Sequence, residues 1–354
     1  MTDFFDKIKY QLDKKLPFAV YSKPVSDIVT GVFQKTGAVH NLTDFNARGF
    51  VFAPFAGNDV VFIPKDDAEV ITVKNEASIE AVLNDLEQPK IDETAKQEFE
   101  SLVKKCVSVI KGRQFEKLVA SRTEKVPVTT DVITIYKRLL QTYPNAFRYC
   151  FYTPKTGLWM GATPEQLLKA HENTIKTVAL AGTQVYSETK EAVWEEKEQQ
   201  EQKFVTDYIL QRLSQYSSDI QATQPYTFRA GNIVHIKTDI TADLKESSNI
   251  GEVINSLHPT PAVCGIPKEQ AKQFLLDNEG YNRKYYSGYL GELNYDFGSG
   301  TSSKTDLFVN LRSMKMSEDN AQLFIGCGIT KDSNPEKEFF ETVNKSITMR
   351  KVLV

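Results

Sequence analysis

Acidic residues on two predicted helices could together hold a divalent cation. The segment 190–216 repeats apolar residues at helical spacing, and Glu201 falls on the apolar side of that repeat. In the helix predicted at the C-terminal end, Glu338, Glu341 and Lys345 share one face. Because carboxylate oxygens suit hard cations, Glu201 and Glu341 could converge on one magnesium ion. Two alternatives stay open: Glu201 reaches water from the edge of the stripe, or Glu341 and Lys345 form an ordinary surface ion pair.

Two glycine-containing segments and one arginine could recognise an anion. The motifs ALAGT (179–183) and GCGI (326–329) each follow an apolar, β-rich run. Glycine in such places lets backbone N–H groups approach a carboxylate closely. Arg312 lies on the predicted strand 306–316, where its guanidinium could bind a carboxylate through two hydrogen bonds. The alternatives are that the glycines only form turns and that Arg312 is a surface residue.

The composition excludes other kinds of site. The chain of 354 residues has 43 basic and 46 acidic side chains, so it has no excess positive charge for nucleic acid, which is not an expected partner. Its 4 cysteines and 4 histidines are scattered, without a CxxC pair or an HExxH motif. A zinc or disulfide site is therefore not predicted, and a bound metal would need carboxylate ligands.

Neither a signal peptide nor a membrane-spanning segment is predicted. The first 15 residues are interrupted by charges every few positions, and no later stretch has eighteen uncharged apolar residues. We expect a cytoplasmic protein that does not bind a membrane.

The elements that must position these residues are predicted from periodicity. Helical spacing extends over 95–112, 131–143, 190–216 and the segment from Ser333 or Asn334 to 353. Strands are predicted at VVFIP (60–64), VITV (70–73), 117–126, 148–153, 157–163, 174–183, 232–244, 306–316 and 321–329. Short connections between most strands favour an α+β fold with largely antiparallel sheets and helices on the outside.

The chain is expected to form one large domain. The acidic segment 84–94, which contains Pro89, is the only candidate boundary. We interpret residues 1–90 as a β-rich part of the same fold and residues 91–354 as the catalytic region.

A long ordered series of motifs resembles the chorismate-utilising enzymes, which include isochorismate, salicylate, anthranilate and aminodeoxychorismate synthases. The resemblance runs from about residue 114 to residue 354, and the first 90 residues contribute little to it. Its motifs are KLVASR, ATPEQLL, ALAGT, KEQQEQKFVTDYI, VHIKTDITADL, LHPTPAVCGIP, RKYYSGYLG, NLRS, GCGI and NPEKEFFETVNK. It departs from the family pattern at Gln202, at Arg283–Lys284 and at Tyr289, which leaves the local loop geometry open.

The resemblance implies a role for each matching residue. Glu201 and Glu341 correspond to direct ligands of Mg²⁺, and Glu338 to a ligand acting through water. Lys117 takes the position of the general base and Glu165 that of the general acid. The positions that match contacts to chorismate are Gly182, Thr183, His258, Tyr286, Arg312, Gly326, Gly328 and Lys345.

Local pattern alone would assign the acid and base differently. Without the resemblance, Lys117 reads as an exposed strand residue, and Glu165 as an acid in the first turn of a helix after Pro164. With it, both side chains are expected to be buried, because the acid must be protonated and the base must be neutral to act.

The residue pair Lys117 and Ala181 implies water as the nucleophile, since aminodeoxychorismate synthases have a nucleophilic lysine at the position of Ala181. The expected activity is therefore that of an isochorismate synthase, acting as a monomer on chorismate. A salicylate synthase, which also eliminates pyruvate, has the same pattern at Lys117 and Glu165 and is the nearest alternative. A component of anthranilate or aminodeoxychorismate synthase, or a catalytically silent chorismate-binding subunit, fits less well.

Overall fold

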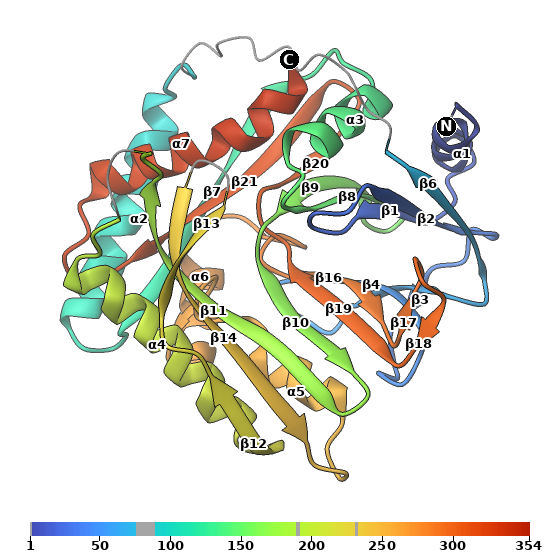
Figure 1. Cartoon of the computed structure of the whole chain (residues 1–354). Coiled ribbons are helices and arrows are strands. Elements are labelled where there is room, and N and C mark those ends of the chain that lie inside the picture. Colours follow the sequence, from blue (N-terminus) through green and yellow to red (C-terminus); the bar gives the residue numbers. More distant parts are fainter. Residues whose placement is uncertain (1, 76–88, 189–191, 231–232) are drawn as a thin grey trace.

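The computed structural model describes residues 2–75, 89–188, 192–230 and 233–354 (Figure 1). Every strand pairing in these residues is antiparallel, and the strands form two large sheets and one two-stranded ribbon. The predicted α+β class with antiparallel sheets is confirmed.

The first sheet has 9 strands and contains the strand that begins with Lys117. Its order is β15 (Gly265–Ile266), β7 (Lys117–Pro127), β21 (Asn320–Ile329), β20 (Ser313–Met316), β9 (Gly157–Thr163), β8 (Phe147–Thr153), β1 (Phe18–Ser22), β2 (Ile28–Gln34) and β6 (Ala68–Lys74).

The second sheet has 10 strands, of which β13 (Tyr226–Ala230) lies off the main path and pairs with β14. Its order is β12 (Ser217–Ala222), β14 (Ile233–Leu244), β11 (Thr174–Val185), β10 (Gln166–His171), β19 (Lys304–Val309), β16 (Tyr289–Leu293), β4 (Gly49–Ala53), β5 (Val61–Pro64) and β3 (His40–Asn41). The ribbon pairs β17 (Tyr295–Asp296) with β18 (Thr301–Ser302).

Aromatic side chains fill the space between the two sheets. Phe147 of β8 stacks on Phe308 of β19 with 4.3 Å between ring centroids, and Phe52 of β4 contacts Phe151 of β8 at 4.5 Å. These rings belong to one buried cluster with members from both sheets. Its burial and ring contacts hold the sheets face to face.

Helices cover the outer faces of both sheets, as predicted (Figure 1). They are α1 (Thr2–Asp13), α2 (Glu93–Lys111), α3 (Val132–Thr142), α4 (Glu196–Leu213), α5 (Ile250–Leu257), α6 (Lys268–Asn278) and α7 (Pro335–Leu353). Apolar side chains of α1, α3 and α7 pack on the first sheet, and those of α4 and α5 on the second. Helices α2 and α6 pack with α7 against β7 and β21.

Helix boundaries agree with the capping signals. Asn334 accepts a hydrogen bond from the Lys337 N–H at the start of α7, and Gly112 follows α2 as predicted. Helix α4, in contrast, begins at Glu196 rather than near residue 190. The Glu198 carboxylate accepts the backbone N–H of Glu195 at 2.8 Å, and this reciprocal cap fixes the start of the helix. Residues 190 and 191 of the predicted helix lie outside the described residues.

One predicted strand, the position of Arg312 and the alternative that the glycines only form turns need correction. The single strand predicted over 306–316 is two strands, β19 and β20, which belong to different sheets. Arg312 lies in the joint between them with a left-handed φ of 46°, so it is not on the face of a strand. The glycines of ALAGT and GCGI lie within β11 and β21, so they are not turn residues after the strands.

The N-terminal residues are part of both sheets. Strands β1, β2 and β6 extend the first sheet, whereas β3, β4 and β5 extend the second. Of the proposed boundary segment, residues 84–88 lie outside the described residues. Within the part of the chain that the structure describes, no helix is long and apolar enough to cross a membrane.

Candidate active site

Most of the predicted site residues line one cavity of about 910 Å³. It is lined by β7, β11, β21, α4 and α7, together with the connections that carry Glu165, Tyr286 and Arg312. The predicted residues on its wall are Lys117, Glu165, Gly182, Glu201, Tyr286, Arg312, Gly326, Gly328, Glu341 and Lys345.

Lys117 and Glu201 face each other across part of this cavity. Lys117 is the first residue of β7 and is only 4% exposed, so the interpretation as an exposed strand residue is wrong. Its Nζ lies 3.6 Å from Oε2 of Glu201, close enough for an ion pair but too long for a hydrogen bond. The Glu201 side chain is 15% exposed, which excludes a solvated position at the edge of the stripe.

Gly328 makes room for the Lys117 side chain. A Cβ atom at Gly328 would lie 3.2 Å from Cε and 3.5 Å from Nζ of Lys117. This glycine of GCGI therefore contributes to the site by leaving space on the wall of β21.

Glu165 lies between β9 and β10, so the interpretation as a helix first-turn acid is wrong. Its backbone is held on both sides: its N–H donates to Oγ1 of Thr163 at 3.3 Å, and its carbonyl accepts the N–H of Val309 at 2.9 Å. Desolvation raises the pKa of the Glu165 carboxyl to about 7, although the charges of Lys117 and Arg312 oppose the shift. Near neutral pH this group can carry a proton and donate it.

Tyr286 and Arg312 supply donors on another part of the wall. Burial raises the pKa of Tyr286 to about 12, so its hydroxyl stays protonated. A Cβ at Gly326 would lie 2.9 Å from the Tyr286 oxygen, so glycine is needed for the close approach. Burial lowers the pKa of Arg312 from its ordinary value, which still leaves the guanidinium charged.

The Glu341 and Lys345 ion pair forms as the surface alternative predicted, with 2.5 Å between Oε1 and Nζ. Both residues also line the cavity, and Lys345 donates to the carbonyl of Gly326 at 3.2 Å. The pair therefore joins α7 to β21 at the cavity wall.

Three predicted residues are not among the described lining residues. His258 contacts the carbonyl of Pro54 through Nε2 at 3.0 Å, and burial lowers its pKa to about 3. Glu338 is 6% exposed and its carboxylate lies beside the thiol of Cys327. Strand β11 includes Thr183, whose side chain is outside the described part of the structure. The roles of these three residues stay predictions.

Among the lining residues that the sequence did not single out are the ionisable side chains of Glu198 and His235. Glu198 lines the cavity one helical turn before Glu201. Glu198 precedes Glu201 by three residues, so helical spacing alone could have indicated that both lie on the same face of α4. His235 also lines the cavity and contacts the carbonyl of Gly182 through Nδ1 at 2.7 Å. No spacing rule links residues 182 and 235, because the contact depends on the pairing of β11 with β14.

The donors on the wall suit a hard cation. Glu198, Glu201 and Glu341 bring carboxylates from two helices to one cavity. Among the described residues, no three His, Cys, Asp or Glu side chains lie close enough together to hold a metal. Magnesium commonly uses only one or two protein carboxylates and completes its shell with water and substrate oxygens. Glu201 and Glu341 fit that requirement in donor chemistry.

Comparisons with known proteins point to one family. A family model described as chorismate binding enzyme matches residues 61–354. The isochorismate synthase MenF of Escherichia coli is 28% identical over 262 residues, which cover 71% of this chain and 59% of that protein. A salicylate biosynthesis isochorismate synthase of Pseudomonas aeruginosa is 29% identical over 268 residues, or 73% of this chain and 55% of that one. The matched part of this chain thus spans less than two thirds of the length of these relatives.

The fold agrees with the sequence comparison. The solved structure of the Escherichia coli menaquinone-specific isochorismate synthase MenF superposes with a TM-score of 0.77 at 21% identity. The superposition covers 96% of this chain and 89% of that one. Since the family model matches residues 61–354, which are most of the chain, the protein belongs to the chorismate-binding enzyme family.

Proposed function

We propose that the protein is an isochorismate synthase, an isomerase that converts chorismate reversibly into isochorismate with Mg²⁺ as cofactor. The observation that carries the proposal is the presence of Lys117 and Glu165 on one cavity wall, with the pKa of Glu165 raised to about 7. An acid and a base at one site are what the exchange of a ring hydroxyl requires.

The two groups act on different ring carbons. Lys117, as the neutral amine, removes a proton from the water that attacks C2. Glu165, as the neutral acid, donates a proton to the hydroxyl that leaves C4. The ring double bonds shift between these events, so one water enters and one water leaves.

Cationic and neutral donors orient the substrate. Arg312, Lys345 and the Tyr286 hydroxyl bind the carboxylates of chorismate, and Gly326 and Gly328 allow close approach of the backbone. When bound by Glu201 and Glu341, magnesium supplies a Lewis acid for the ring carboxylate. Gly182 of β11 also lines the cavity. As the family resemblance implies, we propose that Glu338 acts on Mg²⁺ through water. His258 and Thr183 would contact chorismate.

The nearest rival is a salicylate synthase, which would eliminate pyruvate from isochorismate. Ala181 lines the cavity at the position where aminodeoxychorismate synthases have a nucleophilic lysine. The lack of that lysine favours water as the nucleophile. We further propose a cytoplasmic monomer that needs no partner chain.

Product analysis tests the proposal. Purified protein is incubated with chorismate and Mg²⁺, and products are separated by chromatography with fluorescence detection. Isochorismate without fluorescent salicylate is expected. Salicylate would support the rival, and chorismate left intact would support a silent binding protein. Lys117→Ala and Glu165→Gln are assayed in parallel, and near-native turnover by either variant would refute its assigned role.

A further inference from the structure

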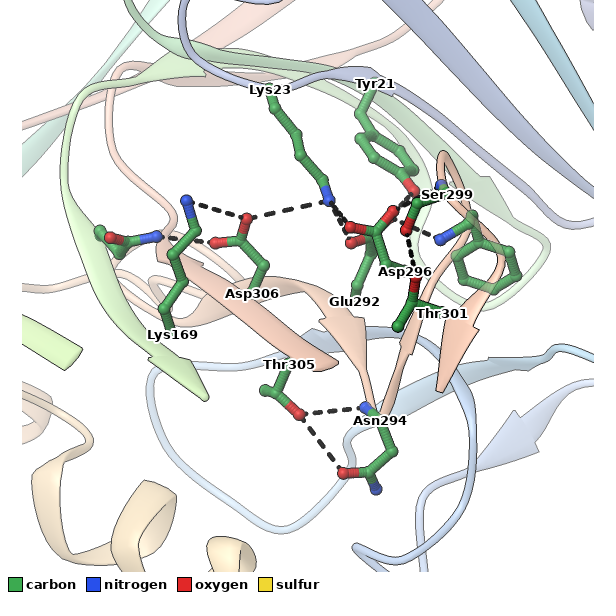
Figure 2. A network of polar contacts seen from close by, with 12 residues as sticks. Tyr21, Lys23, Lys169, Glu292, Asn294, Asp296, Ser299, Thr301, Thr305 and Asp306 are labelled. Atoms are coloured by element: carbon green, nitrogen blue, oxygen red, sulfur yellow. Dashed lines mark hydrogen bonds and ion pairs between the residues drawn. The ribbon is translucent and has the colours of Figure 1, made fainter. Parts of the chain in front are cut away.

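A second group of charged residues lies between the two sheets (Figure 2), and none of its members lines the cavity. Lys23, which follows β1, lies 2.5 Å from Glu292 of β16, 3.1 Å from Asp296 of β17 and 3.9 Å from Asp306 of β19. Lys169 of β10 lies 3.5 Å from Asp306. We call Lys23, Lys169, Glu292, Asp296 and Asp306 the inter-sheet network.

The two central carboxylates of the inter-sheet network are buried and well bonded, whereas the Lys169 side chain is 53% exposed. Glu292 and Asp306 are 1% and 5% exposed. Besides Lys23, Glu292 accepts hydrogen bonds from the Tyr21 hydroxyl and from the N–H of Phe297. Such matched donors offset much of the cost of burying the carboxylates.

One hydrogen bond connects this network to the residue after the general acid. Nε2 of Gln166 donates to Oδ1 of Asp306 at 2.7 Å, and Gln166 directly follows Glu165. The other Asp306 oxygen, Oδ2, faces Lys169 and Lys23. Asp306 thus has one oxygen directed to the network and one directed to the chain that carries Glu165.

The pairing of β10 with β19 is irregular at this point. Gln166 lies opposite Phe308 and Leu168 opposite Leu307, so Leu167 is an extra residue that forms a β-bulge. A bulge removes ladder hydrogen bonds and changes the direction of the neighbouring side chains. The Gln166 side chain spans this irregular segment and ties it to β19.

We propose that Gln166 and Asp306 are positioning residues for Glu165. Their hydrogen bond fixes the start of β10, and with it the direction in which the Glu165 carboxyl enters the cavity. The inference rests on the proposed function, because it assumes that Glu165 is the general acid. A misplacement of about 1 Å in a catalytic group can cost on the order of 10²-fold in rate, so the effect is measurable.

The test compares two substitutions around the same carboxylate. Gln166→Met keeps the side-chain length but removes the donor to Asp306. Lys169→Met is the matched control, because it removes the ion pair to Asp306 from the same strand and leaves the Gln166 bond intact. If Gln166→Met does not fold, Gln166→Asn replaces it in the test, because the shorter side chain does not bring its amide to Asp306. Thermal stability, kcat, KM for chorismate and the pH dependence of kcat are measured for each.

The expected result is a kcat reduced about 10- to 100-fold in Gln166→Met. The KM of Gln166→Met should stay unchanged, because only the position of the general acid is altered. The kcat of Lys169→Met should stay within about twofold of the parent value. The decline of kcat at high pH should move to lower pH, because a less confined Glu165 regains solvent. Equal kcat in the two variants, or a lower kcat with a raised KM and an unaltered pH profile, would overturn the inference.

Glu165→Gln separates this inference from the proposed function. If Glu165→Gln is inactive while Gln166→Met is fully active, the positioning role alone fails. If Glu165→Gln keeps near-native turnover, the acid role fails and the positioning role fails with it.

Discussion

The cavity and the inter-sheet network use the same kinds of residues for different ends. In the network, Lys23 and Glu292 are 2.5 Å apart, and Tyr21 and the Phe297 N–H also bind that carboxylate. In the cavity, Lys117 and Glu201 are 3.6 Å apart beside a space of about 910 Å³. In the filled core, the loss of one partner from a close pair leaves a buried charge uncompensated, whereas the longer separation beside open space leaves groups available to a substrate.

The strongest way to break this comparison is to remove Lys117. Lys117→Ala should lower the turnover of chorismate by about 10²- to 10⁴-fold, because the base for water is lost. Stability should change little by comparison, since the long pair with Glu201 contributes no hydrogen bond. Turnover is followed by chromatography, and an active Lys117→Ala would place the base elsewhere.

Removal of Lys23 should change the stability of the protein rather than its turnover. Lys23→Met removes the cation paired with the buried carboxylate of Glu292, while Asp306 keeps Lys169, and should lower the free energy of unfolding by about 3 kcal/mol. The control is Lys155→Met, whose ion pair with Asp59 is 3.3 Å long and largely exposed, and which should cost less than about 1 kcal/mol. Urea denaturation measures both. Equal effects of the two substitutions would show that the network is not a stability element.

Glu165 should reduce stability at high pH. Its pKa is about 7 in the folded protein, compared with an ordinary value of 4.5, so the folded state binds the proton more tightly. The tighter binding of the proton stabilises the folded state fully below pH 4.5, and this stabilisation is lost as the pH rises through about 7. Glu165→Gln should therefore be more stable than the parent by up to about 3 kcal/mol near pH 8, with a much smaller gain near pH 5. Thermal melts at the two pH values check this, and a pH-independent difference would contradict the raised pKa.

The smallest expected effect concerns the metal. Removing even an indirect contact to a bound metal typically costs 10- to 100-fold in affinity. Glu201→Gln should raise the Mg²⁺ concentration for half-maximal turnover by at least about tenfold, or about 1.4 kcal/mol. Glu196→Gln, on the exposed side of α4, is the control. Turnover that persists in the presence of EDTA would show that the reaction does not need Mg²⁺.

Local patterns in the sequence predicted the helices better than the cavity. The apolar repeat of α4 correctly directed Glu201 inward, and Asn334 correctly marked the start of α7. These features depend on residues a few positions apart. Lys117 pairs with Ile266, and Glu165 is held by Val309, both more than 140 residues away in sequence. Their burial therefore could not be read from spacing, and only the family resemblance indicated their roles.

Arg312 shows the same limit in another form. The run from 306 to 316 alternates like one strand, but the chain leaves one sheet at Val309 and enters the other at Ser313. The left-handed φ of Arg312 allows the change of direction and places the guanidinium at the cavity wall. Tertiary packing, and not local preference, decides such a joint.

The most direct test of the mechanism is the origin of the new hydroxyl group. Chorismate is converted in ¹⁸O-labelled water with Mg²⁺, and isochorismate is analysed by mass spectrometry at low conversion. If Lys117 activates water while Glu165 protonates the leaving hydroxyl, each isochorismate carries one solvent oxygen at C2. Unlabelled isochorismate would mean that the C4 hydroxyl itself moves, which would contradict the assigned roles of Lys117 and Glu165.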